Sequence, residues 1–334
     1  MNRVAVPLDI APPAARPRGA TVVEFGGPTM GVSWRVKAVA PLGFDLDRGQ
    51  TRVQAALNAV VAQMSPWEPR SDISRFNHAP AGAWMDLPDA FQHVLDRALH
   101  WAEASGGAFD PAIGRLVDLR GFGPPGAVAI PPSDAVIAEA LAEGGWDRLA
   151  RDGRRVFQPG GLALDLSGIA KGFGVDEVSA VLRRLGLVDH LVEIGGELRG
   201  EGVKPDGEPW WAEIAAPPGL ALPGGPILAA LHGLSIATSG DYRRVLEHDG
   251  RRYAHTLDPR TGRPVEAGLR SVSVMSATCM DADALCTVLT VLGPDEGAWF
   301  AQEHGVAAFM LVEGAAGVQE IVSPALAAML DEPG

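Results

Sequence analysis

Apolar residues recur every three or four positions in several stretches, which is the spacing of one face of a helix. This pattern predicts longer helices over 53–64, 91–102, 172–185 and 281–292. Pro88 precedes the second of these and Gly106-Gly107 follow it, as proline and glycine often do at helix ends. Ser133 is expected to begin a shorter helix that ends near Glu143, and residues 295–303 predict another.

Short runs of β-branched and aromatic residues, bounded by glycine and proline, predict strands. These runs lie at 21–25, 32–39, 190–194, 210–215, 227–231, 252–257, 269–276 and 306–312. Gly26-Gly27-Pro28 is interpreted as the turn between the first two strands. Strands outnumber helices and do not alternate with them regularly, so we predict an α+β fold rather than a doubly wound sheet.

The chain has 334 residues, with no internal repeat and no long linker. We therefore expect a single domain over 21–330, built as two lobes that share a cleft. Residues 1–20 are rich in Pro and Ala and are expected to form a disordered tail. They contain neither the apolar run of a signal peptide nor a cysteine that could carry a lipid, which predicts a cytoplasmic protein for the sequence as written. No apolar run reaches transmembrane length, so no membrane span is expected.

Composition narrows the possible partners. Hydrophobic residues make up 47% and charged residues 21% of the chain, as in soluble globular proteins. The formal net charge is −13 and no Lys/Arg run stands out, so a nucleic-acid partner is not expected. An anionic ligand must then be met locally, by a metal, a helix N-terminus or a single lysine.

The sequence also excludes several common kinds of site. Cys279 and Cys286 are its only cysteines, which excludes a disulfide framework and a four-cysteine zinc site and favours two buried free thiols. Residues 121–126 match the G-x-G-x-x-G spacing, but prolines fill them and no apolar strand precedes them, so we expect a plain loop. G-x-S-x-G and H-E-x-x-H are absent, which disfavours an α/β-hydrolase and a zinc protease.

Asp283 and Thr287 stand four residues apart on the helix predicted over 281–292. Their side chains therefore share one face of that helix. A carboxylate and a hydroxyl are hard oxygen ligands that suit Mg²⁺. Asp and Thr on a helix are usually just solvated, but this helix is apolar nearly all round, which predicts burial. Because a buried aspartate needs a partner, the pair is a candidate metal site.

Residues 165–172, with the sequence D-L-S-G-I-A-K-G, predict the end of a strand, a glycine-rich turn and the start of a helix. Backbone N–H groups at a helix start suit phosphate, and Lys171 adds a positive charge. Asp165 is placed to hold a ligand hydroxyl or amide. His255 ends a predicted strand just before the turn at 258–262, where a general base or a phosphate contact would lie. Turns and single histidines of this kind are also common as plain structure.

Taken together, the chain resembles the ApbE family, the FAD:protein FMN transferases, from about Thr29 to Gly293. The motifs that carry the resemblance are T-M-G (29–31), M-S-x-W (64–67), S-x-I-S-R-F-N (71–77), G-G-A-F-D (106–110), D-L-x-G-I-A-K-G (165–172), I-G-G-E (194–197), A-T-S-G-D-Y-R (237–243), Y-x-H-x-x-D-P-x-T-G (253–262) and A-D-A-L-x-T (282–287). Each motif alone is weak, but their order and spacing are jointly specific.

The resemblance implies an α+β fold with mixed or antiparallel sheets, flanking helices and two lobes around a flavin-binding cleft. It implies a Mg²⁺-dependent enzyme that cleaves FAD, attaches FMN through a phosphoester to a Thr or Ser of an acceptor flavoprotein subunit, and releases AMP. Many similar proteins are exported or membrane-anchored, which leaves the location of the acceptor open. A FAD pyrophosphatase, with water as the nucleophile, a non-catalytic flavin-binding module and a flavin redox enzyme are the alternatives.

The resemblance also implies roles for individual residues. FAD would contact Met30, Trp67, Ala108, Phe109, Asp110, Asp165, Lys171 and Leu257. Mg²⁺ would be bound by the backbone oxygen of Gly168 and the side chains of Asp283 and Thr287. Catalysis would depend on His255, Lys171 and Asp283, with His255 activating the acceptor hydroxyl or holding the phosphate. Cys286 stands where some similar proteins have Asp, and it is not assigned to the site because a hard cation gains little from a thiol.

Overall fold

The computed structural model describes residues 3–9, 19–128, 130–214, 216–220, 222–240, 245–248, 251–254, 256–265, 268–314 and 317–330. At its centre is an eight-stranded sheet with the order β18-β17-β16-β11-β8-β7-β3-β2, in which every neighbouring pair is antiparallel. Its strands are β2 (Thr21–Thr29), β3 (Val32–Ala40), β7 (His190–Ile194), β8 (Glu197–Glu201), β11 (Leu234–Gly240), β16 (Leu269–Ser276), β17 (Ala307–Gly314) and β18 (Gly317–Val322).

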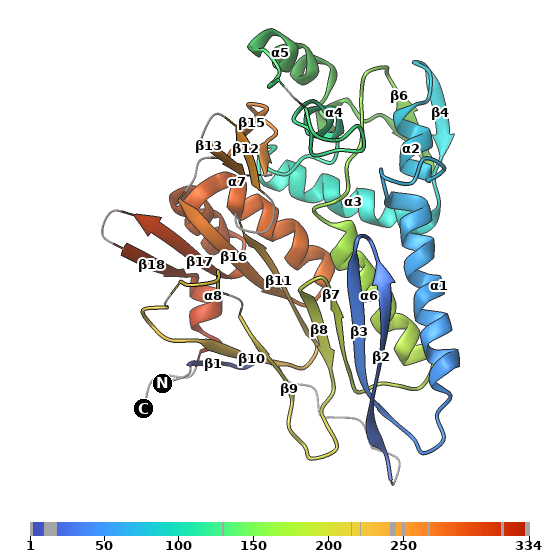
Figure 1. The fold of residues 1–334 in the computed structure, drawn as a ribbon, viewed down its shortest axis with the longest axis vertical. Helices are drawn as coiled ribbons and strands as arrows, with labels where there is room; N and C mark the ends of the chain where they lie inside the picture. Colours follow the sequence, from blue (N-terminus) through green and yellow to red (C-terminus); the bar gives the residue numbers. More distant parts are fainter. Residues whose placement is uncertain are drawn as a thin grey trace.

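Three long helices cover one face of this sheet (Figure 1): α1 (Leu46–Met64), α6 (Ala170–Arg184) and α7 (Cys279–Glu303). The apolar stripes of α1 and α6 pack against the sheet, which is why the helical periodicity of the sequence predicted them, whereas α7 is buried nearly all round. Gly293 has a φ of 77° and Pro294 follows it, so α7 consists of two helical segments, as predicted. Among the described helices, none is long and apolar enough to cross a membrane.

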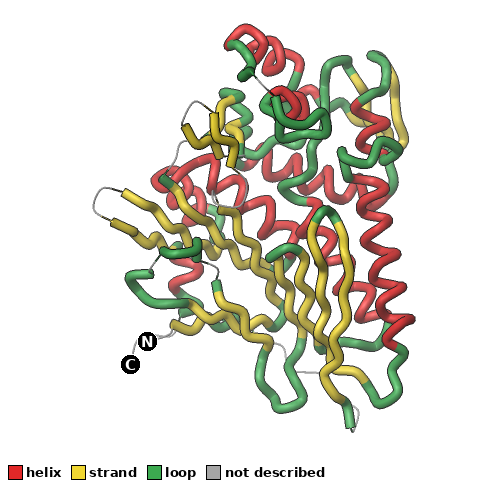
Figure 2. The backbone as a smooth tube through the Cα atoms, viewed as in Figure 1, coloured by secondary structure: helices red, strands yellow, loops and turns green. Residues whose placement is uncertain are grey.

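A second part of the molecule is mainly helical and lies beside one end of the sheet (Figure 2). It contains α2 (Asp72–Asn77), α3 (Asp89–Ala104), α4 (Gly114–Leu119), α5 (Asp134–Glu143), the 3₁₀ turn η1 (Trp146–Arg148) and a small sheet of β4 (Ala83–Asp86), β6 (Arg155–Gln158) and β5 (Arg151–Asp152). Two hairpins lie nearby: β12 (Val245–His248) with β13 (Arg251–Ala254), and β14 (Leu257–Asp258) with β15 (Arg263–Pro264).

The two parts share one hydrophobic core. Its largest cluster joins Phe91 of α3 and Phe76 of α2 to Leu289 of α7 and Val274 of β16. The predicted α+β class, with antiparallel sheets and flanking helices, is therefore confirmed.

The other face of the main sheet packs against a small sheet with the order β1-β10-β9, formed by β1 (Arg3–Ala5), β10 (Ile227–Leu231) and β9 (Trp210–Glu213), and against α8 (Pro324–Ala327). The predicted disordered tail over 1–20 is wrong for β1. This strand pairs in parallel with β10, and Arg3 forms an ion pair of 2.8 Å with Glu320. The backbone pairing and this ion pair give the segment an ordered structure, which its composition alone did not predict.

The turn predicted at Gly26-Gly27-Pro28 is also wrong. β2 runs straight through these residues, and the hairpin turns at Met30 and Gly31 instead, with φ values of 48° and 73°. Positive φ at both positions is typical of the tight turn whose twist matches a β-hairpin. The glycine at 26 serves close packing, because a Cβ there would lie 2.5 Å from the carbonyl oxygen of Trp34.

His190 on β7 is expected to make the stability of the fold depend on pH. The ring is fully buried, its Nδ1–H donates to the carbonyl oxygen of Leu187 (2.7 Å), and Ser179 Oγ–H donates to its Nε2 (2.8 Å). Burial lowers the pKa of His190 from 6.5 to about 4. Between these values the unfolded chain binds a proton that the folded chain does not, so stability falls as the pH falls through this window.

We expect the free energy of unfolding to be about 2 kcal/mol lower at pH 5 than at pH 7 through this group. Urea titrations at both pH values measure it. His190→Asn should flatten the pH dependence, whereas His100→Asn, at an exposed position of α3, should leave it unchanged. Equal pH slopes for the wild type and His190→Asn would contradict this expectation.

Candidate active site

The first turns of α6 and α7 meet at a glycine. A Cβ on Gly172 would lie 2.2 Å from the carbonyl oxygen of Cys279 and 2.8 Å from Cβ of Asp283, so no side chain fits there. Asp176, one turn further along α6, accepts hydrogen bonds from the backbone N–H of Cys279 (3.0 Å) and of Met280 (2.9 Å). The start of α7 is thereby held against α6, and Asp283 faces the first residues of α6.

Gly168, Asp283 and Thr287 come together at this contact. Asp283 is only 6% exposed, and its Oδ2 accepts the N–H of Gly172 at 2.9 Å. No residue that the structure describes donates a hydrogen bond to the carbonyl oxygen of Gly168. Thr287 Oγ1 would lie 3.0 Å from a Cβ on Gly168. A carbonyl, a carboxylate and a hydroxyl are therefore contributed by neighbouring residues, and their chemistry fits Mg²⁺.

This set differs from the commoner kind of metal cluster. Within the described ranges, no group of three or more His, Cys, Asp or Glu side chains could hold a metal ion. The set at Gly168 has only one such side chain and two neutral oxygen donors. Mg²⁺ tolerates that composition, because it usually keeps several water or phosphate ligands.

The G-G-A-F-D loop packs next to Gly168. Phe109 Cε2 would lie 3.3 Å from a Cβ on Gly168, and both Phe109 and Ala108 are buried. Asp110 accepts the backbone N–H of Ala112 (2.7 Å) and of Trp146 (3.3 Å). Burial raises the pKa of Asp110 to about 6, although these two hydrogen bonds oppose the shift. Phe109 therefore packs beside Gly168, and Asp110 is tied to Ala112 and Trp146.

Asp165 is half-buried and belongs to the same neighbourhood. Its Oδ1 accepts the N–H of Ser167 (2.7 Å), and its own N–H donates to the carbonyl oxygen of Pro111 (2.8 Å). Burial, and then repulsion from Asp165, raises the pKa of nearby Asp118 to about 6. The segment before Asp165 reads as strand-like in the sequence, but it forms only one isolated bridge, between Ala163 and Ile113.

Lys171 lies on the first turn of α6 and forms an ion pair with Glu197, with 2.6 Å between Nζ and Oε1. The Glu197 side chain is 2% exposed, whereas that of Lys171 is 27% exposed. Glu197 belongs to the I-G-G-E motif, but no local feature of that motif assigns it a role. The buried carboxylate fixes the position of the lysine ammonium, which still reaches solvent.

Met30 lies at the turn of the β2–β3 hairpin, and its Cε would be 3.2 Å from a Cβ on Gly174 of α6. Its φ of 48° is the only positive value of a non-glycine residue in the described part of the chain. Trp67, between α1 and α2, is 57% exposed and so leaves a large aromatic surface in solvent. The contacts of Met30 and Trp67 with FAD that the resemblance implies stay predictions.

The remaining candidates divide into three cases. Leu257 on β14 is buried against Leu116 and Ile137. His255 lies outside the described residues, so its predicted role stays a prediction. Cys286 is fully buried, and its Sγ–H donates to the carbonyl oxygen of Ala237 (3.2 Å) on the sheet side of α7. Cys279 and Cys286 are both free and buried, as predicted.

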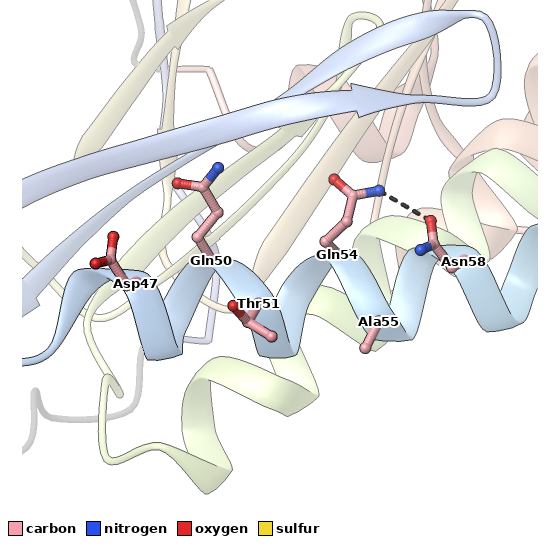
Figure 3. A pocket seen from close by; sticks show the side chains of 6 residues that line it. All are labelled: Asp47, Gln50, Thr51, Gln54, Ala55 and Asn58. Atoms are coloured by element: carbon pink, nitrogen blue, oxygen red, sulfur yellow. Dashed lines mark hydrogen bonds between the residues drawn. The ribbon is translucent and has the colours of Figure 1, made fainter.

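A polar hollow along α1 is a separate feature. It is lined by Asp47, Gln50, Thr51, Gln54, Ala55 and Asn58, all from that one helix (Figure 3). Gln54 is engaged there, since it donates to Asn58 Oδ1 (3.0 Å) and accepts from Trp34 Nε1 (2.8 Å). None of the residues predicted to bind flavin or metal lines this hollow, so we do not assign the reaction to it.

Residues 30–310 match the family model described as the ApbE family. A curated relative from Haemophilus influenzae, "FAD:protein FMN transferase", is 33% identical over 317 residues, which are 92% of this chain and 91% of that protein. The protein of the same name from Vibrio cholerae is 35% identical over 310 residues, 90% of each chain.

Solved structures resemble this fold closely. The apo form of Pseudomonas stutzeri flavinyl transferase ApbE has a TM-score of 0.86 and 39% identity, covering 93% of this chain and 97% of that one. Flavin transferase ApbE from Vibrio cholerae has a TM-score of 0.85 and 34% identity, covering 93% and 99%.

Proposed function

The chain belongs to the ApbE family and is an FAD:protein FMN transferase, and we propose that its reaction depends on Mg²⁺ held by the Gly168 carbonyl oxygen, Asp283 and Thr287. The observation that supports this most directly is the contact between α6 and α7, which brings the buried carboxylate of Asp283 to the segment that carries the Gly168 carbonyl, next to the Thr287 hydroxyl. Mg²⁺ bound there would neutralise the charge that develops on the FAD pyrophosphate.

The protein groups then position the reactants. We propose that a Thr or Ser hydroxyl of an acceptor protein attacks the FMN-side phosphorus of FAD. A new P–O bond forms, the bond to the AMP-side oxygen breaks, and AMP leaves. His255 is our candidate for taking the hydroxyl proton, and Lys171, held by Glu197, supplies a fixed positive charge to the phosphates. Catalysis is then mostly positioning and electrostatics, as is usual for phosphoryl transfer.

Mass spectrometry of an acceptor peptide tests this function. A Thr-bearing peptide is incubated with the protein, FAD and Mg²⁺, beside a sample without peptide in which AMP is assayed. The expected result is a mass gain on the peptide that matches FMN and disappears with EDTA. AMP release without a labelled peptide would instead favour the pyrophosphatase. Bound FAD with neither product would favour the non-catalytic flavin-binding module.

The exposed Trp67 gives a second test, of the flavin contact. Trp67→Ala is expected to raise the Kd for FAD about tenfold, because a stacked aromatic contact contributes about 1 kcal/mol or more. Trp67→Tyr should keep most of the affinity. Trp211→Ala is the matched control, since Trp211 is 39% exposed but lies on β9, in the small sheet on the other face of the main sheet. Equal FAD affinity in Trp67→Ala and Trp211→Ala would remove Trp67 from the site.

A further inference from the structure

The candidate residues contact the start of α6 at successive levels, which form a row along the helix axis. Met30 faces Gly174, Asp283 faces Gly172, and Thr287 and Phe109 face Gly168. Gly172 and Gly174 are two residues apart, so Met30 lies on a different side of the helix from Asp283. Along the axis, Met30 is at one end of the row, Asp283 is in the middle, and Thr287 and Phe109 are together at the other end.

The row continues beyond Phe109 to Gly107. A Cβ on Gly107 would lie 3.5 Å from Nε1 of Trp146 and 3.8 Å from Cγ of Arg260. Gly107 has a φ of 82°, so its backbone already disfavours a side chain. An indole and an arginine therefore flank the G-G-A-F-D loop, at the end of the row that is remote from Met30.

The guanidinium of Arg260 and the backbone of Trp146 are held in place. Arg260 donates from Nε to Asp258 Oδ1 (2.9 Å) and from Nη2 to Asp258 Oδ2 (3.0 Å), which leaves its Nη1 without a hydrogen bond to any described residue. The turn that carries Arg260 is anchored by Arg120, which donates to the carbonyl oxygen of Gly262 at 2.9 Å. The backbone of Trp146 is tied to Asp110, and its half-exposed indole donates no hydrogen bond within the described part of the chain.

We propose that Trp146 and Arg260 bind the adenylate half of FAD, with the indole against the purine and the guanidinium on the AMP-side phosphate. FAD carries its flavin ring at one end, its pyrophosphate in the middle and its adenosine at the other end. This order matches Met30, the proposed metal ligands, and the pair at Gly107. A planar guanidinium with a remaining N–H edge suits phosphate, and an indole suits a purine face.

This inference rests on the proposed placement of the flavin and the metal. It also gives a reason why the enzyme would prefer FAD to FMN as a substrate. Transfer requires a leaving group on the pyrophosphate, so the enzyme must prefer the dinucleotide to FMN. Contacts that only the adenylate half can reach provide this preference. The chain has a net charge of −13, so an anionic ligand needs a local positive charge, and a pre-positioned arginine provides one.

Calorimetric titration of the full chain tests the pair without any turnover. AMP, FAD and FMN are titrated in EDTA and without acceptor into the wild type, Arg260→Gln, Trp146→Ala and Arg263→Gln. Arg263 is the matched control, because it lies three residues further on and pairs with exposed Asp134 (3.1 Å). We expect the Kd for AMP and for FAD to rise about tenfold in the first two variants, and the Kd for FMN to stay within about twofold.

Arg260→Gln keeps the backbone N–H of residue 260 that donates to Asp258 Oδ1 (2.9 Å), so the turn should persist. Arg260→Lys should recover part of the AMP affinity. AMP affinities equal to that of the wild type in both variants would overturn the proposal, and so would an equal loss for FMN. Because these titrations contain no metal and no acceptor, they are independent of the metal assignment, which fails only if Asp283 variants keep Mg²⁺-dependent transfer.

Discussion

Replacing Asp283 by asparagine is expected to lower the rate of FMN transfer on the order of 10³-fold or more, with the fold retained. Asparagine has nearly the same shape, and its Oδ1 can still accept the N–H of Gly172 that Asp283 accepts at 2.9 Å. The substitution therefore removes the negative charge and leaves the contact between α6 and α7. A purely structural aspartate would tolerate the change, whereas a metal ligand would not.

The measurement is the initial rate of peptide labelling across a Mg²⁺ series, together with urea unfolding of the same samples. Asp295→Asn is the control, because Asp295 is exposed on the second segment of the same helix. Asp283→Asn should show little labelling at any Mg²⁺ concentration, and Asp295→Asn should match the wild type. A rate within about threefold of the wild type for Asp283→Asn in Mg²⁺ would refute the metal assignment.

The long helices were predictable because the spacing of their apolar residues indicates which side of each helix is buried. The same reasoning placed Asp283 and Thr287 on one helical face, and both face the start of α6 in the structure. Helix spacing is a local property, so four residues of sequence suffice to fix it. The prediction of a buried Asp283 is confirmed, at 6% exposure.

Features that depend on distant partners were missed. β8 and β11 are central strands with polar or glycine positions, and their pairing across the sheet decides their conformation rather than local propensity. Gly26 was assigned to a turn because glycine often marks one, but the nearby Trp34 carbonyl oxygen is what requires it. Glu197 reveals its link to Lys171 only once β8 and α6 are placed together.

The resemblance to a family supplied what spacing could not. Nothing local to Gly168 marks its carbonyl as a ligand, and Met30 would pass as an ordinary core residue. The structure adds that these residues occupy one row, and that Trp146 and Arg260 extend it. Neither of these two residues stands out in the sequence, since each lies in a turn far along the chain from the loop that it flanks.

Gly172→Ala is expected to destabilise the protein by about 3 kcal/mol or more, although alanine is the better helix former by about 1 kcal/mol. Gly172 is an interior residue of α6 without positive φ, so local propensity alone predicts stabilisation. The overlap with α7 outweighs this gain and makes the net change in stability unfavourable. The new Cβ would lie 2.2 Å from the carbonyl oxygen of Cys279 and 2.6 Å from its carbonyl carbon, and backbone atoms cannot rotate away.

The helices cannot simply move apart, because Asp176 ties the N–H groups of Cys279 and Met280 to α6. Gly174→Ala is the matched comparison on the same helix. Its Cβ would meet only side-chain ends, Met30 Cε at 3.2 Å and Leu57 Cδ2 at 3.5 Å, which can shift. Urea unfolding should show a large loss of stability for Gly172→Ala and a change within about 1 kcal/mol for Gly174→Ala. Equal stabilities would mean that α7 can retreat, and Asp283 would then not be held where the proposed metal site needs it.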